Sequence, residues 1–141
     1  MTATKKNVLF LCVANSSRSQ IAEGLAKSKL APSFNIKSAG SNPGKLNPFA
    51  VRVMSEIGID ISNQYSKAMA DLEPRFIAEL DYVITLCAEE VCPTVSSKAK
   101  KQHWGLVDPA DAQGSDVEKL AVFRKVRDEL ALRIDEFKKQ I

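Results

Sequence analysis

The chain has 141 residues, of which 45% are hydrophobic and 26% charged, and its formal net charge is +3. These values are typical of one globular domain spanning residues 1–141, and the charge is too small to indicate a nucleic-acid partner. The apolar runs are too short for a membrane span or a signal peptide, and three cysteines fit a reducing compartment better than a disulfide framework, so we expect a cytoplasmic protein.

The first part of the chain alternates strand and helix patterns. Residues 8–12 are apolar on both faces, which predicts a central parallel strand. Ser17 or Ser19 is expected to cap a helix that ends before Pro32. Residues 34–38 alternate between apolar and polar side chains and predict a second strand.

The middle of the chain carries clear helix boundaries. Asn47 suits an N-cap, Pro48 the first helical position, and Gly58 the end of that helix. Residues 60–67 read as an irregular polar connection, and residues 73–80 as a short helix.

The last part of the chain predicts two strands and a long helix. Residues 82–86 are apolar throughout and end on Cys87, and residues 102–106 form a weaker strand pattern. Near the C-terminus, apolar residues recur every three or four positions, which predicts the buried stripe of a long helix. It consists of Val117, Leu120, Phe123, Val126, Leu130, Ile134 and Phe137.

Strands that alternate with helices predict an α/β fold with a four-stranded parallel sheet and helices on both faces. Ligands of such sheets bind at the carboxyl ends of the strands. Cys12 and Cys87 end the first and third predicted strands, and Asp108 follows the fourth. If the first and third strands are neighbours, we expect all three side chains to share one rim of the sheet.

The connection between the first strand and the first helix combines a nucleophile with groups that bind anions. Arg18 follows Cys12 after five intervening residues, and a helical pattern starts at once. Backbone N–H groups converge on an anion at such a position, and the same field favours a thiolate. The planar guanidinium of Arg18 can bind two oxygens of a tetrahedral oxyanion. This pattern predicts attack of the Cys12 thiolate on a phosphate-like centre.

The other cysteines and the histidine have simpler interpretations beside the functional ones. Cys87 and Cys92 do not match the spacing of zinc ligands, and His103 fits packing or support of a neighbour, so we expect no metal site. A redox relay would need a nucleophile, a second cysteine on the same rim and a third to resolve the disulfide. From the residues alone, burial of Cys87 and Cys92 as small core side chains is an equally good interpretation.

Asp108 precedes Pro109 at the end of the predicted fourth strand. A carboxyl group held there could act as a general acid above the thiolate. Asp-Pro is also a common turn, and from these two residues alone a turn is the better interpretation.

At this point the chain resembles the low-molecular-weight tyrosine phosphatase fold and, more narrowly, the thioredoxin-coupled arsenate reductases built on it. The loop from Cys12 to Gln20 and the following Ala22-Glu23-Gly24 carry the broader resemblance. The narrower one rests on motifs that run in family order over nearly the whole chain. They are Ser38-Ala39-Gly40, Leu46-Asn47-Pro48, Gly58-Ile59-Asp60-Ile61-Ser62, Thr85-Leu86-Cys87, Cys92-Pro93, His103-Trp104-Gly105 and Asp108-Pro109.

The resemblance implies a mechanism with three cysteines. Cys12 attacks arsenate, Arg18 and the loop amides hold its oxygens, and Asp108 protonates the leaving oxygen. Cys87 then attacks Cys12 and arsenite leaves, after which Cys92 attacks Cys87 and an external reductant opens the final disulfide. Ser19 would steady the thiolate and Asn15 would brace the loop. The implied oxyanion loop consists of Val13, Ala14, Asn15, Ser16, Ser17, Arg18 and Ser19.

Four features depart from the family pattern. Several relatives carry a further cysteine inside the oxyanion loop, where this chain has Ser16 and Ser17. Ala110 stands where phosphatases of this fold usually carry an aromatic residue, which removes a platform for a phosphotyrosine ring. The segment between Cys87 and Cys92 is two residues shorter than usual. Lys67 stands where relatives carry an Asp that helps hold potassium. Its ammonium could take the place of the ion against Glu23, or it could simply point into solvent.

We therefore predict an arsenate reductase that acts as a monomer without a cofactor of its own and receives electrons from thioredoxin, or alternatively from glutaredoxin with glutathione. Phosphate or sulfate should bind as mimics of arsenate. One competing hypothesis is a phosphatase of the same fold that hydrolyses phosphomonoesters. It needs neither Cys87 nor Cys92, although weak phosphatase side activity is compatible with the reductase. The other is a non-enzymatic oxyanion-binding or partner-binding domain, which needs neither nucleophile nor acid.

Overall fold

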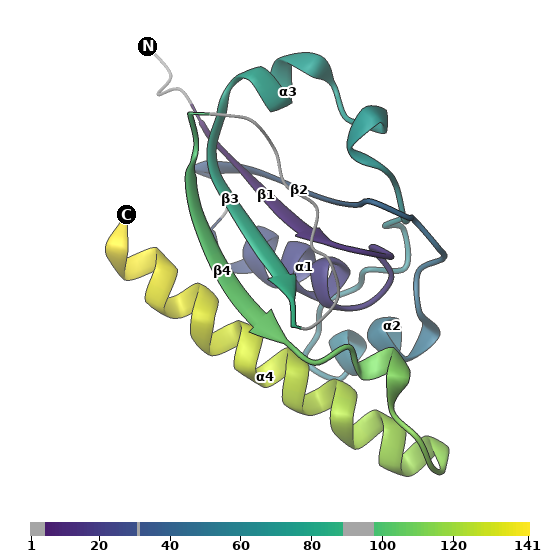
Figure 1. Ribbon diagram of the computed structural model, residues 1–141. Coiled ribbons are helices and arrows are strands. Elements are labelled where there is room, and N and C mark those ends of the chain that lie inside the picture. The colour runs from purple at the N-terminus through teal and green to yellow at the C-terminus, as the bar shows by residue number, and fades with distance from the viewer. Residues whose placement is uncertain (1–4, 31, 89–97) are drawn as a thin grey trace.

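The computed structural model describes residues 5–30, 32–88 and 98–141 and contains one four-stranded parallel sheet (Figure 1). The strand order is β2-β1-β3-β4, so the first and third strands are neighbours, as the rim prediction requires. All four predicted strands are confirmed, each extended by two or three residues. They are β1 (Lys6–Cys12), β2 (Phe34–Gly40), β3 (Leu80–Cys87) and β4 (Lys100–Leu106).

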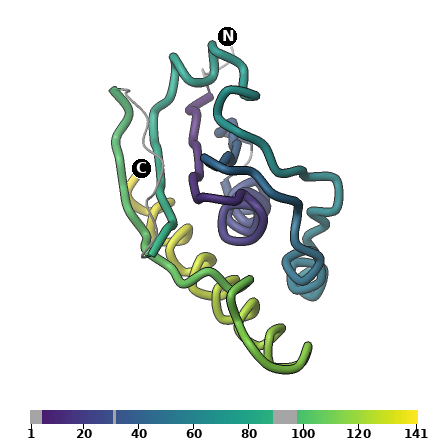
Figure 2. The backbone as a smooth tube through the Cα atoms, turned by 45° about the vertical axis from the view of Figure 1, so that its right-hand side comes forward, coloured from purple at the N-terminus to yellow at the C-terminus, as the bar shows by residue number. Residues whose placement is uncertain are grey.

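Helices cover both faces of the sheet, as predicted, but unequally. One face packs against three longer helices, and α4 lies against α1 and α2 on that face (Figure 1, and the backbone tube of Figure 2). The other face is covered by one short helix and a 3-10 turn, through a smaller cluster that includes Leu72 and Phe76. The three longer helices are α1 (Arg18–Leu30), α2 (Pro48–Ser55) and α4 (Asp116–Gln140), and the opposite face carries η1 (Met69–Asp71) and α3 (Pro74–Ala78).

Helix ends follow the predicted capping residues. Asn47 Oδ1 accepts a hydrogen bond from the Phe49 amide at 2.8 Å, and Gly58 has a φ of +78° beyond the end of α2. Helix α1 begins at Arg18, so Ser17 rather than Ser19 holds the N-cap position. No helix among the described residues is long and apolar enough to cross a membrane.

Two details of the prediction are wrong. The short helix predicted over residues 73–80 ends at Ala78, because Leu80 already opens β3 and packs into the smaller core cluster. Val117 is 75% exposed, since it lies in the first turn of α4, where residues 116–118 are all exposed. The other six residues of the predicted stripe are buried.

Candidate active site

The loop that follows β1 turns the carbonyl groups of residues 13–16 outwards. Because the N–H of a trans peptide points opposite to the preceding carbonyl, the N–H groups of residues 14–17 face inwards, over Cys12. The Asn15 amide shows this directly, since it donates to Cys12 Sγ at 3.2 Å. Hydrogen-bond donors outside the loop hold the carbonyls. The Asn42, Gly44 and Asn47 amides donate to the carbonyls of Val13, Ala14 and Ser16 at 2.9, 2.9 and 3.0 Å, and Ser66 Oγ donates to that of Asn15 at 2.6 Å. The inner side of the loop is therefore lined by hydrogen-bond donors.

The Cys12 sulfur is buried among donors at the carboxyl end of β1. It is a free thiol with 2% exposure. Ser19 Oγ lies 2.8 Å from Cys12 Sγ, in addition to the Asn15 amide. The Asn15 amide is a donor to this sulfur, whereas in the contact with Ser19 either the hydroxyl or the thiol can donate.

Asn15 connects the sulfur to the protein interior. Its φ of +51° is a left-handed conformation that few residues other than glycine adopt easily, although Asn tolerates it better than most. Its Oδ1 accepts a hydrogen bond at 3.0 Å from the main-chain N–H of Lys67, and a main-chain N–H can only donate. The Nδ2 atom must therefore face the other way, where it donates to Ser19 Oγ at 2.7 Å and to Ser38 Oγ at 3.0 Å.

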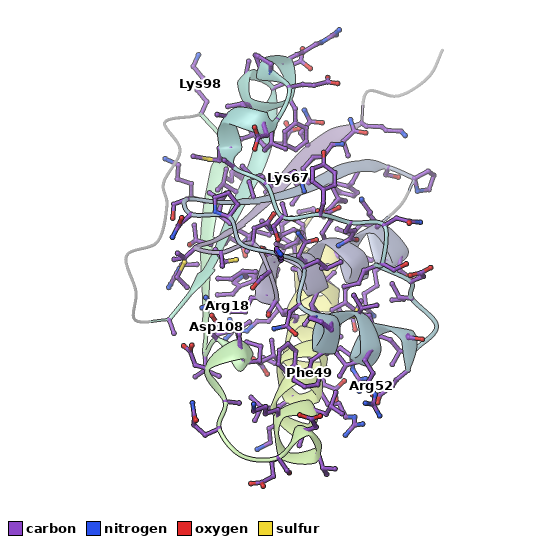
Figure 3. The ribbon with its side chains drawn as sticks, turned by 90° about the vertical axis from the view of Figure 1, so that its right-hand side faces the viewer. Arg18, Phe49, Arg52, Lys67, Lys98 and Asp108 are labelled. Atoms are coloured by element: carbon purple, nitrogen blue, oxygen red, sulfur yellow. The ribbon has the colours of Figure 1, made fainter. Side chains whose placement is uncertain are left out.

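Arg18 and Asp108 meet at the same rim, from the start of α1 and from just beyond β4. Figure 3 shows the two side chains next to each other, and Arg18 Nη2 lies 3.5 Å from Asp108 Oδ2. Arg18 is 2% exposed and also donates from Nη1 to the Leu106 carbonyl at 3.0 Å. Asp108 Oδ1 accepts a hydrogen bond from the Ala110 amide at 3.0 Å, the side chain is 20% exposed, and its Oδ2 faces Arg18 at the edge of the site.

Ser17 gives an independent sign of an anion site. Among the described residues, its Oγ is the one buried side-chain polar atom without a hydrogen-bond partner. It lies at the N-cap of α1, where the helix dipole is positive. A buried hydroxyl without a partner costs free energy, and an oxyanion in the loop would accept its hydrogen. The geometry of the loop therefore fits a tetrahedral anion.

Cys87 lies beside this loop on the neighbouring strand. Leu11 of β1 pairs with Thr85 of β3, so Cys12 and Cys87 both stand at the carboxyl end of adjacent strands. Cys87 is buried and disulfide-bonded, whereas Cys12 is free. Cys92, the third predicted redox residue, lies outside the described residues.

Glu23 and Lys67 form a buried ion pair behind the loop. Lys67 Nζ lies 3.6 Å from Glu23 Oε1, and both side chains are less than 8% exposed, so the interpretation that Lys67 points into solvent is wrong. Ser38 Oγ donates to the same Glu23 oxygen at 2.5 Å. Because an ammonium already stands at the carboxylate, these residues do not fit a potassium ion there. No group of three or more His, Cys, Asp or Glu among the described residues could hold a metal.

Three supporting residues escaped sequence reasoning. Gly40 pairs with Cys12 in register, and a Cβ there would stand 2.3 Å from the Val13 carbonyl oxygen. Gln20 binds the Asn15 carbonyl at 2.9 Å, and Ser66 binds it as well. The glycine at the end of a strand and Gln20, which directly follows the loop, were the available signals, whereas Ser66 meets the loop only through the tertiary fold.

His103 takes neither a core nor a metal-binding position. It is exposed on β4, and its Nδ1 lies 2.6 Å from Thr85 Oγ1 on the neighbouring strand. Trp104, the next residue, is buried against the face covered by α4. The contact with Thr85 is compatible with the supporting role considered for His103.

Comparison with known proteins gives a consistent result. The family described as low molecular weight phosphotyrosine protein phosphatase matches residues 7–141. An arsenate reductase of Halalkalibacterium halodurans is 47% identical over 135 residues, which cover 94% of this chain and 95% of the relative. A solved arsenate reductase in the phosphate binding state has a TM-score of 0.80 at 33% identity, with 96% and 98% of the two chains covered. A thioredoxin-dependent arsenate reductase of Corynebacterium glutamicum has a TM-score of 0.74 at 30% identity, and the match covers 99% of this chain and 63% of that one.

Proposed function

The chain belongs to the low molecular weight phosphotyrosine protein phosphatase family, and we propose that within it the chain is an arsenate reductase whose nucleophile is Cys12. The observation that carries this proposal is that a second cysteine, Cys87, stands beside the loop that follows Cys12. Cys87 stands on the strand adjacent to β1 and is disulfide-bonded while Cys12 is free. A phosphatase needs only Cys12, Arg18 and Asp108. A reductase also needs a second thiol, which is oxidised to a disulfide with Cys12 after the attack.

The first step uses the loop and the acid. The Cys12 thiolate attacks arsenic, an S–As bond forms and an As–O bond breaks. The N–H groups of residues 14–17, the Ser17 hydroxyl and Arg18 bind the oxygens that carry the negative charge. Asp108 supplies the proton that lets the departing oxygen leave as water. This step is not a redox step, since arsenic stays pentavalent.

The second step transfers two electrons to arsenic. The Cys87 thiolate attacks the Cys12 sulfur, a Cys12–Cys87 disulfide forms, and the electron pair of the S–As bond remains on arsenic, which leaves as arsenite. Cys92 then attacks Cys87 and releases Cys12 as a thiolate. A free Cys12 beside a disulfide-bonded Cys87 is the arrangement that this last exchange would leave.

The reaction needs an external dithiol and no resident cofactor. Thioredoxin is the first choice, because the solved relative from Corynebacterium glutamicum is described as thioredoxin-dependent. Glutaredoxin with glutathione is the alternative donor. A thiol nucleophile that must be regenerated in each cycle fits a reducing cytoplasm.

Arsenite production with each donor tests the proposal. The purified protein is incubated with arsenate and either thioredoxin with its reductase and NADPH, or glutaredoxin with glutathione. We expect multiple turnovers with at least one donor and none without a donor. A protein with intact thiols that forms no arsenite even in a single turnover would contradict the proposal.

Replacing each cysteine separates the reductase from the phosphatase. Cys12→Ser should abolish all chemistry. Cys87→Ser should stop arsenite production but leave slow hydrolysis of a phosphomonoester, because loop and acid remain. Cys92→Ser should give about one turnover and trap a Cys12–Cys87 disulfide, which mass spectrometry of peptides detects. Normal multiple turnover of Cys92→Ser with thioredoxin as the sole donor would exclude the relay.

A further inference from the structure

Lys67 and Glu23 are buried charges that no step of the proposed mechanism uses. Both side chains are less than 8% exposed, and their nearest charged atoms lie 3.6 Å apart. Buried charges are costly unless they are paired and hydrogen-bonded, so their presence directly behind the nucleophile's loop calls for a physical reason.

A continuous hydrogen-bonded path runs from this ion pair to the Cys12 sulfur. Glu23 accepts from Ser38, Ser38 accepts from Asn15 Nδ2, and the same Nδ2 donates to Ser19, which lies 2.8 Å from Cys12 Sγ. A carboxylate can only accept, so the Ser38 hydrogen points at Glu23 and its lone pair is free for Asn15. The Ser19 hydroxyl, which accepts from Asn15, retains its hydrogen for the sulfur.

Lys67 acts on this path at two points. Its main-chain N–H holds Asn15 Oδ1 at 3.0 Å and so sets the direction of the amide. Its ammonium stands against Glu23, where it is further held by the Tyr65 carbonyl at 3.3 Å and the Tyr65 ring at 4.8 Å from the centroid. Lys27 also binds Glu23, at 2.6 Å, but its side chain is 50% exposed, so solvent screens its charge far more.

We propose that Lys67 is a positioning residue for the nucleophile: its ammonium cancels the negative charge of Glu23, which would otherwise disfavour a second anion at Cys12. This inference rests on the proposed role of Cys12 as a thiolate. Glu23 supplies the acceptor that orients Ser38, and Lys67 removes the electrostatic cost of having a carboxylate near a thiolate. The path then presents donors to the sulfur without a net charge behind it.

The surroundings of Lys67 agree with this role. Burial lowers the pKa of the Lys67 ammonium, Glu23 opposes that effect, and Lys27 and Lys37 add to it. Lys67 also borders a cavity of about 630 Å³ that is lined by charged residues from several elements. The other charged residues that line this cavity are Lys5, Lys37, Asp71, Glu73, Arg75 and Glu79, while the charged groups at the Cys12 end are Arg18 and Asp108.

The test measures Cys12 alone, in a chain with Cys87→Ser and Cys92→Ser. The rate of alkylation by iodoacetamide between pH 5 and pH 10 reports the thiolate fraction and needs no arsenate. Lys67→Met keeps the main-chain N–H and removes the ammonium. We expect the midpoint of its pH profile to rise by about one unit, as for a nearby uncompensated like charge. Lys67→Arg should keep the original midpoint.

A double variant distinguishes charge cancellation from a merely structural role. Lys67→Met with Glu23→Gln removes both charges, and we expect the midpoint to return towards that of the parent chain. A structural role predicts the opposite, because the double variant loses more native contacts. This variant leaves no unpaired buried charge, so it also serves if Lys67→Met alone fails to fold.

Lys37→Met is the matched control, because Lys37 lines the same cavity but is exposed and is not paired with Glu23. It should leave the midpoint unchanged. An unchanged midpoint in folded Lys67→Met, an equal shift in Lys37→Met, or a double variant that moves further from the parent would each overturn the proposal. Because alkylation is independent of arsenate, the absence of arsenite production would count against the proposed function and not against this inference.

Discussion

Gly40 shows how a single residue without a side chain shapes the loop that follows Cys12. It ends β2 opposite Cys12, and a Cβ there would lie 2.3 Å from the Val13 oxygen and 3.0 Å from the Asn15 nitrogen. Both neighbours are backbone atoms that are fixed by other hydrogen bonds, so they cannot move aside independently. The inward direction of the loop amides therefore depends on the absence of a Cβ at this position.

We predict that Gly40→Ala displaces the loop. Overpacking of this kind costs about 1–3 kcal/mol, and we expect a lower melting temperature together with at least a roughly tenfold slower alkylation of Cys12. Gly44→Ala is the control, because its Cβ would meet only the Ala14 Cβ, at 4.0 Å. Calorimetry and iodoacetamide kinetics give the two readouts. Parent-like kinetics in Gly40→Ala would mean that the loop tolerates the added methyl group.

Lys67 leads to a second prediction at this scale, that activity is indifferent to potassium. The ammonium stands 3.6 Å from Glu23, where a bound cation would be repelled. The measurement is arsenite production in potassium chloride and in sodium chloride at the same ionic strength, so that screening is constant. Saturable stimulation by potassium would contradict the prediction. Lys67→Asp is the complementary variant, and it should gain a dependence on potassium.

At the scale of elements, Glu56 joins α2 to α4. Arg124 binds its carboxylate at 2.7 and 2.9 Å, and Arg127 binds it at 3.0 Å. The hydrogen bond from Arg124 is the main reason why the pKa of Glu56 falls from 4.5 to about 2. A depressed carboxyl pKa contributes stability above the unfolded value, and this contribution is lost as the pH falls through about 2.

We predict that Glu56→Gln lowers the melting temperature most above pH 5 and that the difference from the parent shrinks towards pH 2. Thermal unfolding at several pH values between 2 and 7 tests this. Glu79→Gln is the control, since Glu79 has one exposed ion pair with Arg75 within its own helical segment and should matter little at any pH. A difference for Glu56→Gln that stays constant with pH would show that the ion pair does not explain it.

The same scale shows what sequence patterns can and cannot predict. The central strands and α4 follow from hydrophobic periodicity, which is a local property, and Cys12, Arg18 and Asp108 come together because parallel strands end at one rim. The length of α3 was overestimated because Leu80 belongs to β3, a pairing that only the sheet decides. Likewise, the contact of Ser66 with Asn15 joins residues 51 positions apart, and no local pattern encodes it.

For the whole molecule, an anion bound in the loop would be linked to global stability. It joins β1 to α1, which pack in the main core cluster, so an anion that binds only the folded loop must stabilise the entire fold. The inward amides and the partnerless Ser17 hydroxyl offer donors that exist only in the native state. Unfolding of the chain would have to release the anion first.

We therefore predict that phosphate, sulfate and arsenate raise the melting temperature. At a concentration a hundred times the Kd, the gain is about 2.7 kcal/mol, which for a chain of this size corresponds to roughly 5–10 °C. Chloride at matched ionic strength controls for screening. Arg18→Ala should lose most of the increase, whereas Arg52→Ala, which removes an exposed arginine of α2, should retain it. If sulfate stabilised Arg18→Ala as much as the parent, the anion would be binding elsewhere, and the loop would not be the site that couples oxyanions to the fold.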